Sequence, residues 1–209
     1  TTATEHPSVL ETCKYLQTIG FELTVLPVDV NGRVSVEQVC KAIRPDTILL
    51  TIQWGNNELG TLNPIAEIAE LCEEQNVFLH SDATQVIGKI EFSLEDMPGL
   101  QAISISAHKY FGPKGVGVAY LKQDAYNLYP DITPLFHGGG QEYGLRSGTL
   151  AVHNIVGMGV ASKIAATKLK HNIEQLTLLE KRLVELLQQQ FGSNIKFNQP
   201  STNKIPGIV

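Results

Sequence analysis

The stretch NPIAEIAELCEEQNVFLHSDATQ, residues 63–85, contains a complete helix-to-strand unit. Asn63 and Pro64 are typical of a helix start, because proline is tolerated in the first turn of a helix. The apolar residues that follow share one helical face: Ile65, Ile68, Ala69 and Cys72. The run VFLHS (77–81) is short and mostly apolar, as expected of a strand inside a sheet. A helix that leads directly into a buried strand favours an α/β fold.

The alternation of helix and strand continues in both directions from this stretch. Helical spacing is found in residues 7–20 and 35–43, the second with a capping-box signal at Ser35 and Gln38. Further strands are predicted at 21–28 (FELTVLPV), 47–53 (TILLTIQ), 102–106 (AISIS) and 115–121 (GVGVAYL). The fold class is therefore α/β, with a mostly parallel sheet and helices on both sides.

The last quarter of the chain has a different pattern. Residues 149–190 are helical in spacing almost throughout, which predicts one long connecting helix followed by another. NIKFN (194–198) is a further strand candidate. We therefore predict a large domain over residues 1–150, and over 151–209 the connecting helices with the beginning of a smaller α+β domain.

Composition narrows the function classes. The net charge is −5 and no run of basic residues occurs, which argues against a nucleic-acid surface. No apolar stretch reaches the roughly 20 residues of a membrane span, so the expected location is the cytoplasm or an organelle matrix. Cys13, Cys40 and Cys72 are widely spaced without a metal-ligand pattern, and no metal site is predicted. Each falls in a helical apolar pattern and is expected to pack in the core.

Polar residues follow the predicted strands at their carboxyl ends, where open parallel sheets bind ligands. These residues are Asn56, Asn57 and Glu58 after 47–53, Asp82 and Gln85 after 77–81, and Ser106, His108 and Lys109 after 102–106. We expect them to meet at one edge of the sheet.

Lys109 and Asp82 together suit pyridoxal phosphate. A lysine amine forms a Schiff base with the aldehyde of this cofactor, and a carboxylate beside the pyridine nitrogen keeps that nitrogen protonated, so that the ring accepts electrons. Lys109 would be the amine and Asp82 the carboxylate. At a strand end we expect desolvation to favour the neutral, nucleophilic form of Lys109.

Five motifs occur in an order that resembles one known family. They are TEHPSVL (4–10), NNELGT (56–61), HSDATQVIGK (80–89), SISAHKYFGPKGVG (104–117) and GGGQEYGLRSGTL (138–150). Together they resemble the cysteine desulfurases of the class V aminotransferase family, in the group that supplies sulfur for iron–sulfur clusters. The resemblance implies a three-layer α/β/α domain of the fold-type-I pyridoxal-phosphate transferases.

The resemblance implies catalytic roles for two residues, Lys109 and His6. Lys109 would hold the cofactor covalently, and Asp82 would pair with its ring nitrogen. His6 in TEH would stack on the pyridine ring and assist proton transfer. Read without the resemblance, His6 could instead cap the helix that follows it.

The resemblance also implies cofactor-binding roles for the other polar residues. Asn57 and Gln85 would lie near the phenolic oxygen, Ser106 and His108 would hold the phosphate, and Thr149 would reach the phosphate of a neighbouring subunit. A homodimer is therefore expected. Read alone, Asn57 and Asp82 could instead be turn residues that bond their own backbone.

The implied reaction converts L-cysteine to L-alanine and passes persulfide sulfur to an acceptor or scaffold protein. Family members are longer, with the sulfur-carrying cysteine in a later segment, so this chain resembles a partial member and we expect it to be inactive alone. Two alternatives stay open: another class V enzyme such as a selenocysteine lyase, or a non-catalytic module that acts through partner contacts. A dinucleotide-binding domain is disfavoured, since no GxGxxG motif follows a strand.

Overall fold

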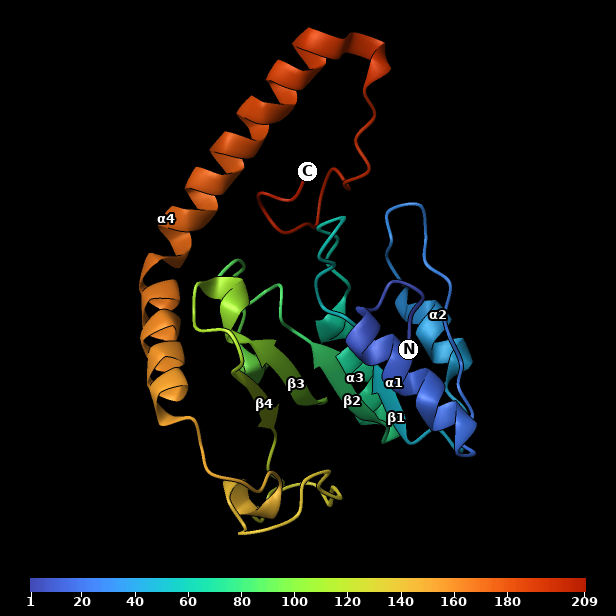
Figure 1. Cartoon of the computed structure of the whole chain (residues 1–209). Helices are drawn as coiled ribbons and strands as arrows, with labels where there is room; N and C mark the ends of the chain where they lie inside the picture. The colour runs from blue at the N-terminus through green and yellow to red at the C-terminus, as the bar shows by residue number, and fades with distance from the viewer.

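The computed structural model describes residues 1–209 and centres on a four-stranded sheet in the order β1-β2-β3-β4 (Figure 1). The strands are β1 (Leu49–Thr51), β2 (Phe78–Asp82), β3 (Leu100–Ser106) and β4 (Gly117–Leu121). The first three run parallel, and β4 pairs antiparallel with β3. The mostly parallel sheet predicted from the sequence is confirmed.

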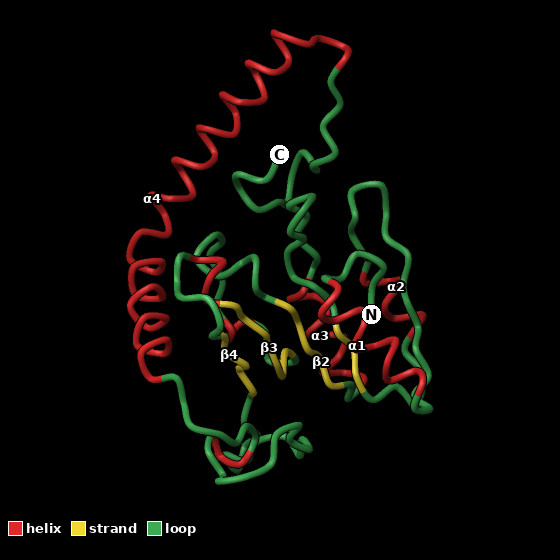
Figure 2. Tube along the Cα trace, in the orientation of Figure 1, coloured by secondary structure: helices red, strands yellow, loops and turns green.

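The helices are α1 (Pro7–Thr18), α2 (Val36–Ala42), α3 (Ile65–Gln75) and α4 (Val152–Phe191). A short 3-10 turn, η2 (Ala107–Tyr110), follows β3 directly. Three further 3-10 turns are η1 (Leu94–Asp96), η3 (Glu142–Gly144) and η4 (Gly192–Asn194). Figure 2 shows the strands side by side and the long irregular segment between β4 and α4. None of the helices is both long enough and apolar enough to span a lipid bilayer.

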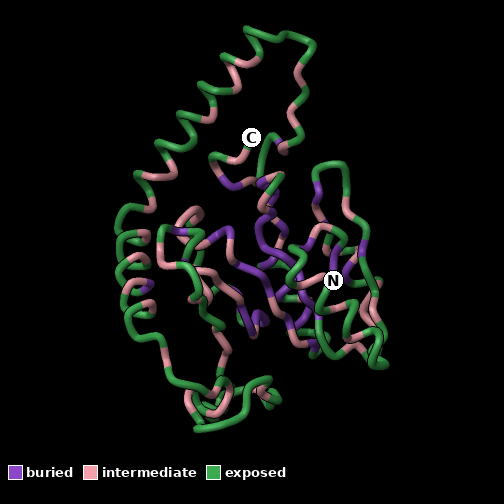
Figure 3. The backbone as a smooth tube through the Cα atoms, in the orientation of Figure 1, coloured by how far each residue is buried: buried purple, intermediate pink, exposed green.

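The main core lies between α3 and the sheet. The face of α3 predicted to be apolar is buried: Ile65, Ile68, Ala69 and Cys72. It packs against β2 and β3, where Leu79 and Leu100 are almost fully buried. Each such side chain removed from water contributes on the order of 2 kcal/mol. In Figure 3 the buried residues accordingly follow the sheet and the helix behind it.

The start of α2 has the capping box predicted from its sequence. Ser35 Oγ accepts a hydrogen bond from Gln38 N at 3.1 Å, and Gln38 Oε1 accepts one from Ser35 N at 2.9 Å. Two backbone donors that no helical carbonyl can reach are thereby satisfied.

The strands predicted at 21–28 and 194–198 do not form. Leu26 makes a single parallel bridge to Thr2, with Leu26 N donating to Thr1 O at 2.8 Å. A strand needs a ladder of backbone bonds to a neighbour, and here only residues 1–3 lie beside the segment. Residues 194–198 pair with no strand, and an alternating pattern alone does not supply a partner.

α4 is one helix of 40 residues, where the sequence predicted two in succession. No proline occurs within it, and most of its residues are strong helix formers, so nothing interrupts the backbone bonds. Its first turns pack on η2, where Met158 joins Ala107 and Tyr110 in a small second core. Gly157 permits this approach, because a Cβ there would lie 2.7 Å from Pro113 Cγ. The division into domains at 150/151 stays a prediction.

The prediction that all three cysteines are core residues is wrong in part. Cys72 is buried on α3, Cys13 is half-buried and Cys40 is exposed. On α2 the one buried residue is Val39. Cys40 follows it directly and therefore lies about 100° further round the helix, facing water.

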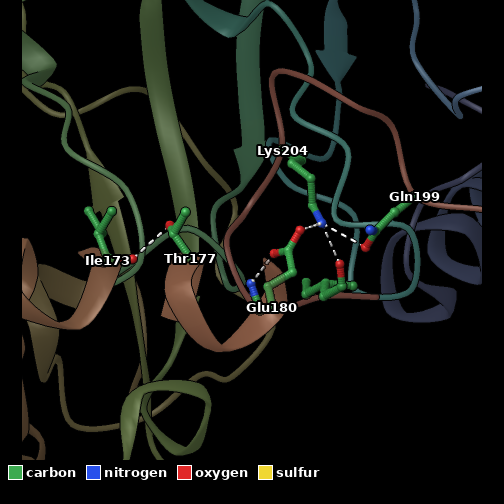
Figure 4. A network of polar contacts seen from close by, with 7 residues as sticks. Ile173, Thr177, Glu180, Gln199 and Lys204 are labelled. Carbon is green, nitrogen blue, oxygen red and sulfur yellow. Dashed lines mark hydrogen bonds and ion pairs between the residues drawn. The ribbon is translucent and has the colours of Figure 1, made fainter. Parts of the chain in front are cut away.

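The chain returns to the sheet after α4 through residues 199–209, which are held by a partly buried ion pair (Figure 4). Lys204 Nζ lies 2.6 Å from Glu180 Oε1 and also donates to Gln199 Oε1 and to Ile208 O. The other Glu180 oxygen accepts a hydrogen bond from Gly207 N at 2.8 Å. Both side chains are less than a fifth exposed, and Lys204 uses all three of its donors.

The same returning segment also contacts the loop after β1. Ile205 is fully buried, and its N–H donates to Gly60 O at 2.7 Å. Lys204 forms an isolated antiparallel bridge with Thr61. The Glu180–Lys204 pair therefore ties α4 to the segment that leads from β1 to α3.

Glu180→Ala is expected to lower the free energy of unfolding by about 2 kcal/mol, because it removes the hydrogen bonds that a partly buried carboxylate accepts from Lys204 and from Gly207 N. Glu37→Ala is the matched control: its partner Lys41 lies at the same 2.6 Å, but both side chains are about three-quarters exposed. We expect a change below about 0.5 kcal/mol there. Urea unfolding followed by circular dichroism measures both. Equal losses of stability in the two variants would show that the Glu180–Lys204 pair contributes no more than an exposed ion pair.

Candidate functional site at the carboxyl ends of the strands

Near the carboxyl ends of the strands, one face of the sheet carries polar side chains on three strands. Thr51 Oγ1 is hydrogen-bonded to His80 Nδ1 at 2.7 Å, and His80 Nε2 to Ser104 Oγ at 2.8 Å. Burial lowers the pKa of His80, and the nearby Asp82 charge offsets part of that effect. Since His80 and Asp82 are two residues apart on β2, their side chains lie on the same face. Sequence reasoning missed His80, whose signal was a polar residue inside an apolar strand.

Asp82 ends β2 on this face and is 6% exposed. Its Oδ1 accepts a hydrogen bond from Thr84 N at 2.9 Å, so the interpretation of Asp82 as a turn residue is confirmed. The other oxygen, Oδ2, accepts no hydrogen bond from the protein. Asp82 can therefore hold its own turn and still offer a carboxylate oxygen to a ligand.

Lys109 lies on η2, immediately after β3, together with His108. Both side chains are exposed, while Ala107 and Tyr110 on the same turn are buried. The expected desolvation of Lys109 is therefore wrong for this structure: its two neighbours take the inward positions of the turn. Ser106, the last residue of β3, is half-buried and its hydroxyl makes no hydrogen bond to the protein.

Gln85 is buried near the same edge, and its Oε1 accepts a hydrogen bond from Lys89 Nζ. Burial lowers the pKa of Lys89, and the positive charge of Lys109 lowers it further. The two ammonium groups are thus close enough to interact. Lys89 is a second amine near the predicted site that sequence reasoning did not single out.

His6 caps α1. Its Nδ1 accepts a hydrogen bond from Ser8 N at 3.2 Å and lies 2.8 Å from Ser8 Oγ. The side chain is exposed. The interpretation of His6 as a helix cap is therefore confirmed, and its role toward a cofactor ring stays a prediction.

Asn57 is half-buried, and its Oδ1 accepts a hydrogen bond from Gln53 Nε2 at 3.3 Å. The turn in this segment is held by its neighbour: Asn56 Oδ1 accepts hydrogen bonds from Glu58 N and Leu59 N, both at 2.9 Å. The interpretation of Asn57 as the residue that holds this turn is therefore wrong. Asn57 keeps its amide donors for another partner.

Thr149 does not join the other predicted site residues. It is exposed and lies just before α4. Residues 122–151 lie beyond β4, on the side of the sheet away from α1 (Figure 1). The structure thus gathers the residues that follow β1, β2 and β3 at one edge, as parallel strands require, and leaves Thr149 outside that group.

A comparison with protein families shows which kind of α/β domain carries this edge. The family model described as aminotransferase class-V matches residues 1–209. The chain belongs to the class-V aminotransferase family. The family confirms the α/β fold class and excludes a dinucleotide-binding domain, and its members are pyridoxal-phosphate enzymes.

Two curated relatives carry related names. "Cysteine desulfurase IscS" of Dictyoglomus turgidum is 40% identical over 209 residues, which are 100% of this chain and 51% of that protein. "Probable cysteine desulfurase, mitochondrial" of Schizosaccharomyces pombe is 41% identical over 207 residues, 99% of this chain and 40% of that protein. The chain thus spans about half the length, or less, of the curated relatives it matches. The resemblance to cysteine desulfurases is confirmed.

Solved structures agree with this family. A structure titled "NifS-like protein" matches with a TM-score of 0.90 and 40% identity, over 98% of this chain and 54% of the other. DndA from Streptomyces lividans matches with a TM-score of 0.81 and 37% identity, over 89% of this chain and 52% of the other. The fold of this class-V chain is therefore that of the NifS-like enzymes.

The residues present fit pyridoxal phosphate by their chemistry. The free Asp82 Oδ2 suits a protonated ring nitrogen, and the exposed Lys109 amine suits an aldehyde carbon. The Ser106 hydroxyl and the His108 imidazole can donate hydrogen bonds to phosphate oxygens. The specific role of each residue stays a prediction.

Proposed function

We propose that the complete protein is a pyridoxal-phosphate-dependent cysteine desulfurase that converts L-cysteine to L-alanine and passes the sulfur to an acceptor. The observation that carries the proposal is the pairing of Asp82, with one unused carboxylate oxygen, and the free amine of Lys109 at neighbouring strand ends. The names of the relatives that cover this whole chain support the choice of substrate. They do not favour a selenocysteine lyase or a non-catalytic module.

Bound pyridoxal phosphate supplies an electron sink for negative charge on the substrate carbon. Asp82, buried at the end of β2, would keep the proton on the ring nitrogen. Lys109 would hold the cofactor through Nζ and, when released, carry a proton to and from the substrate. His6 would assist that proton transfer from the side of α1.

The remaining predicted residues would orient the cofactor. Asn57 has free amide donors, and Gln85 is buried beside Lys89, so both suit an anionic ring oxygen. Ser106 and His108 would bind the phosphate. We propose that Thr149, whose side chain is exposed, serves the phosphate of a second subunit in a homodimer.

Sulfur transfer requires a second protein as acceptor or scaffold, as in iron–sulfur cluster or thio-cofactor assembly. We propose a cytoplasmic or organelle-matrix location, which agrees with the mitochondrial relative.

The complete protein, supplied with pyridoxal phosphate, L-cysteine and a thiol reductant, is expected to release alanine and sulfide in equal amounts. The reaction breaks the bond between Cβ and sulfur, so each alanine must be matched by one sulfide. Both products are measured in the same samples, with L-selenocysteine in a parallel arm. Turnover of selenocysteine with none of cysteine would replace the proposed substrate, and release of neither product would refute the desulfurase assignment.

A further inference from the structure

A cluster of buried polar side chains lies between the segment that carries His6 and the turn that carries Asn57. Its members are Thr2, Glu5, Gln53, Asn56 and Asn63. None is more than 7% exposed. Polar groups are costly to bury unless they are hydrogen-bonded, so such a cluster fixes the segments that it joins.

Glu5 is the centre of the cluster. Its Oε1 accepts hydrogen bonds from Thr2 Oγ1 at 2.7 Å and from Gln53 N at 2.8 Å. The second bond joins residues 48 positions apart in the chain. Glu5 therefore attaches the segment before α1 to the backbone at the end of β1.

The contacts continue from Gln53 to Asn57. The Gln53 side chain accepts a hydrogen bond from Asn56 Nδ2 at 3.2 Å and donates one to Asn57 Oδ1 at 3.3 Å. Asn56 Nδ2 also donates to Thr4 O at 3.1 Å, a second link to the N-terminal segment. Asn63 Nδ2 donates to Gln53 O at 2.7 Å. Gln53 is thus held at its N–H, its carbonyl and its side chain.

Glu5 Oε2 is the unusual atom in this arrangement, because it is buried and has no hydrogen-bond partner. Burial raises the pKa of Glu5, and the negative charge of Asp82 adds to that effect, while the bonds from Gln53 and Thr2 oppose it. Both hydrogen bonds that Glu5 accepts, from Thr2 and from Gln53, use Oε1. A glutamine, which keeps that oxygen and replaces Oε2 by an amide nitrogen, can therefore preserve them.

We propose that Glu5 is a positioning residue of the cofactor site, which ties the segment carrying His6 to the turn carrying Asn57. It acts through Gln53 and does not itself contact the cofactor. The inference rests on the proposed function, because the relative placement of His6 and Asn57 matters only if both residues serve the cofactor. Glutamate suits the position because its carboxyl group reaches a hydroxyl and a distant backbone N–H at once.

The test uses the complete protein and measures the dissociation constant of pyridoxal phosphate by absorbance titration. Glu5→Ala is expected to raise that constant about tenfold, since both hydrogen bonds to Oε1, from Thr2 and from Gln53, are lost. Glu5→Gln is expected to stay within about threefold of the wild type. Glu91→Ala is the matched control, because Glu91 is an exposed glutamate outside the predicted site and its side chain makes no hydrogen bond.

Three further measurements make the result decisive. Unfolding midpoints of the cofactor-free variants separate a general loss of stability from a change at the site, and kcat and KM are determined for each variant. If Glu5→Ala does not fold, Thr2→Val replaces it, because it removes one donor to Oε1 at nearly constant volume; about a threefold weaker binding of the cofactor is expected.

Each outcome decides something. Wild-type affinity in Glu5→Ala, or in Thr2→Val where it replaces it, overturns the positioning role. Cofactor binding by Glu5→Gln as weak as that by Glu5→Ala also overturns the positioning role, because the hydrogen bonds to Oε1 would then not explain the loss of affinity. A wild-type protein that binds no pyridoxal phosphate refutes the proposed function itself and the positioning role with it.

Discussion

Lys109→Ala is expected to abolish the covalent, borohydride-reducible attachment of pyridoxal phosphate and to lower kcat at least about 10³-fold. The reason is that no other group at the end of β3 offers a primary amine: Ser106 and His108 are its polar neighbours there. The measurement is mass spectrometry of peptides from the complete protein after reduction. In the wild type, the cofactor mass should appear on the peptide that contains Lys109.

Two other lysines make this experiment selective. Lys114→Ala is the control, because Lys114 is an exposed lysine of the glycine-rich turn after η2, and this variant should retain both attachment and turnover. Lys89 is the competing amine, since burial and the charge of Lys109 lower its pKa. Cofactor found on Lys89 in the wild type would show that the assignment of Lys109 is wrong.

Asp82→Asn is expected to lower kcat by about 10²- to 10³-fold while changing the dissociation constant of pyridoxal phosphate much less. The amide keeps Oδ1 as acceptor for Thr84 N, so the turn is preserved. The negative charge that would hold the ring-nitrogen proton is lost, and that charge matters most when electrons enter the ring. Steady-state kinetics and cofactor titration of the complete protein give the two quantities.

Asp131→Asn is the control for this variant. Asp131 is exposed and its side chain makes no hydrogen bond or ion pair in the structure, so the same loss of charge there should leave kcat within about twofold. A loss of cofactor affinity in Asp82→Asn as large as the loss of kcat would mean that Asp82 serves binding alone.

Local patterns were sufficient for the α-helices and strands that lie between Ser35 and Ser106. The capping box at Ser35, the apolar face of α3 and the strand β2 each depend on residues within a few positions of one another. The order of strands along a parallel sheet then brings their carboxyl ends together. Asp82 and Lys109 could therefore be selected as candidate site residues before any contact was known.

The same reasoning failed where a structure depends on a neighbouring strand or on which side of a helix or turn meets the core. A strand at 21–28 requires a neighbouring ladder, and only the bridge between Thr2 and Leu26 exists. The exposure of Cys40 depends on which side of α2 meets the core, and Val39 takes that side. The exposure of Lys109 depends on which residues of η2 meet α4.

The sequence by itself determined the class of fold and the family, and it selected the candidate site residues at the strand ends. Only the tertiary structure decided the contacts between distant segments: Glu5 with Gln53, His80 between Thr51 and Ser104, and Glu180 with Lys204. The physical reason is the range of each effect. Periodicity, caps and motifs act within a few residues, whereas a hydrogen bond between positions 48 apart exists only because packing of the whole sheet brings two distant segments together.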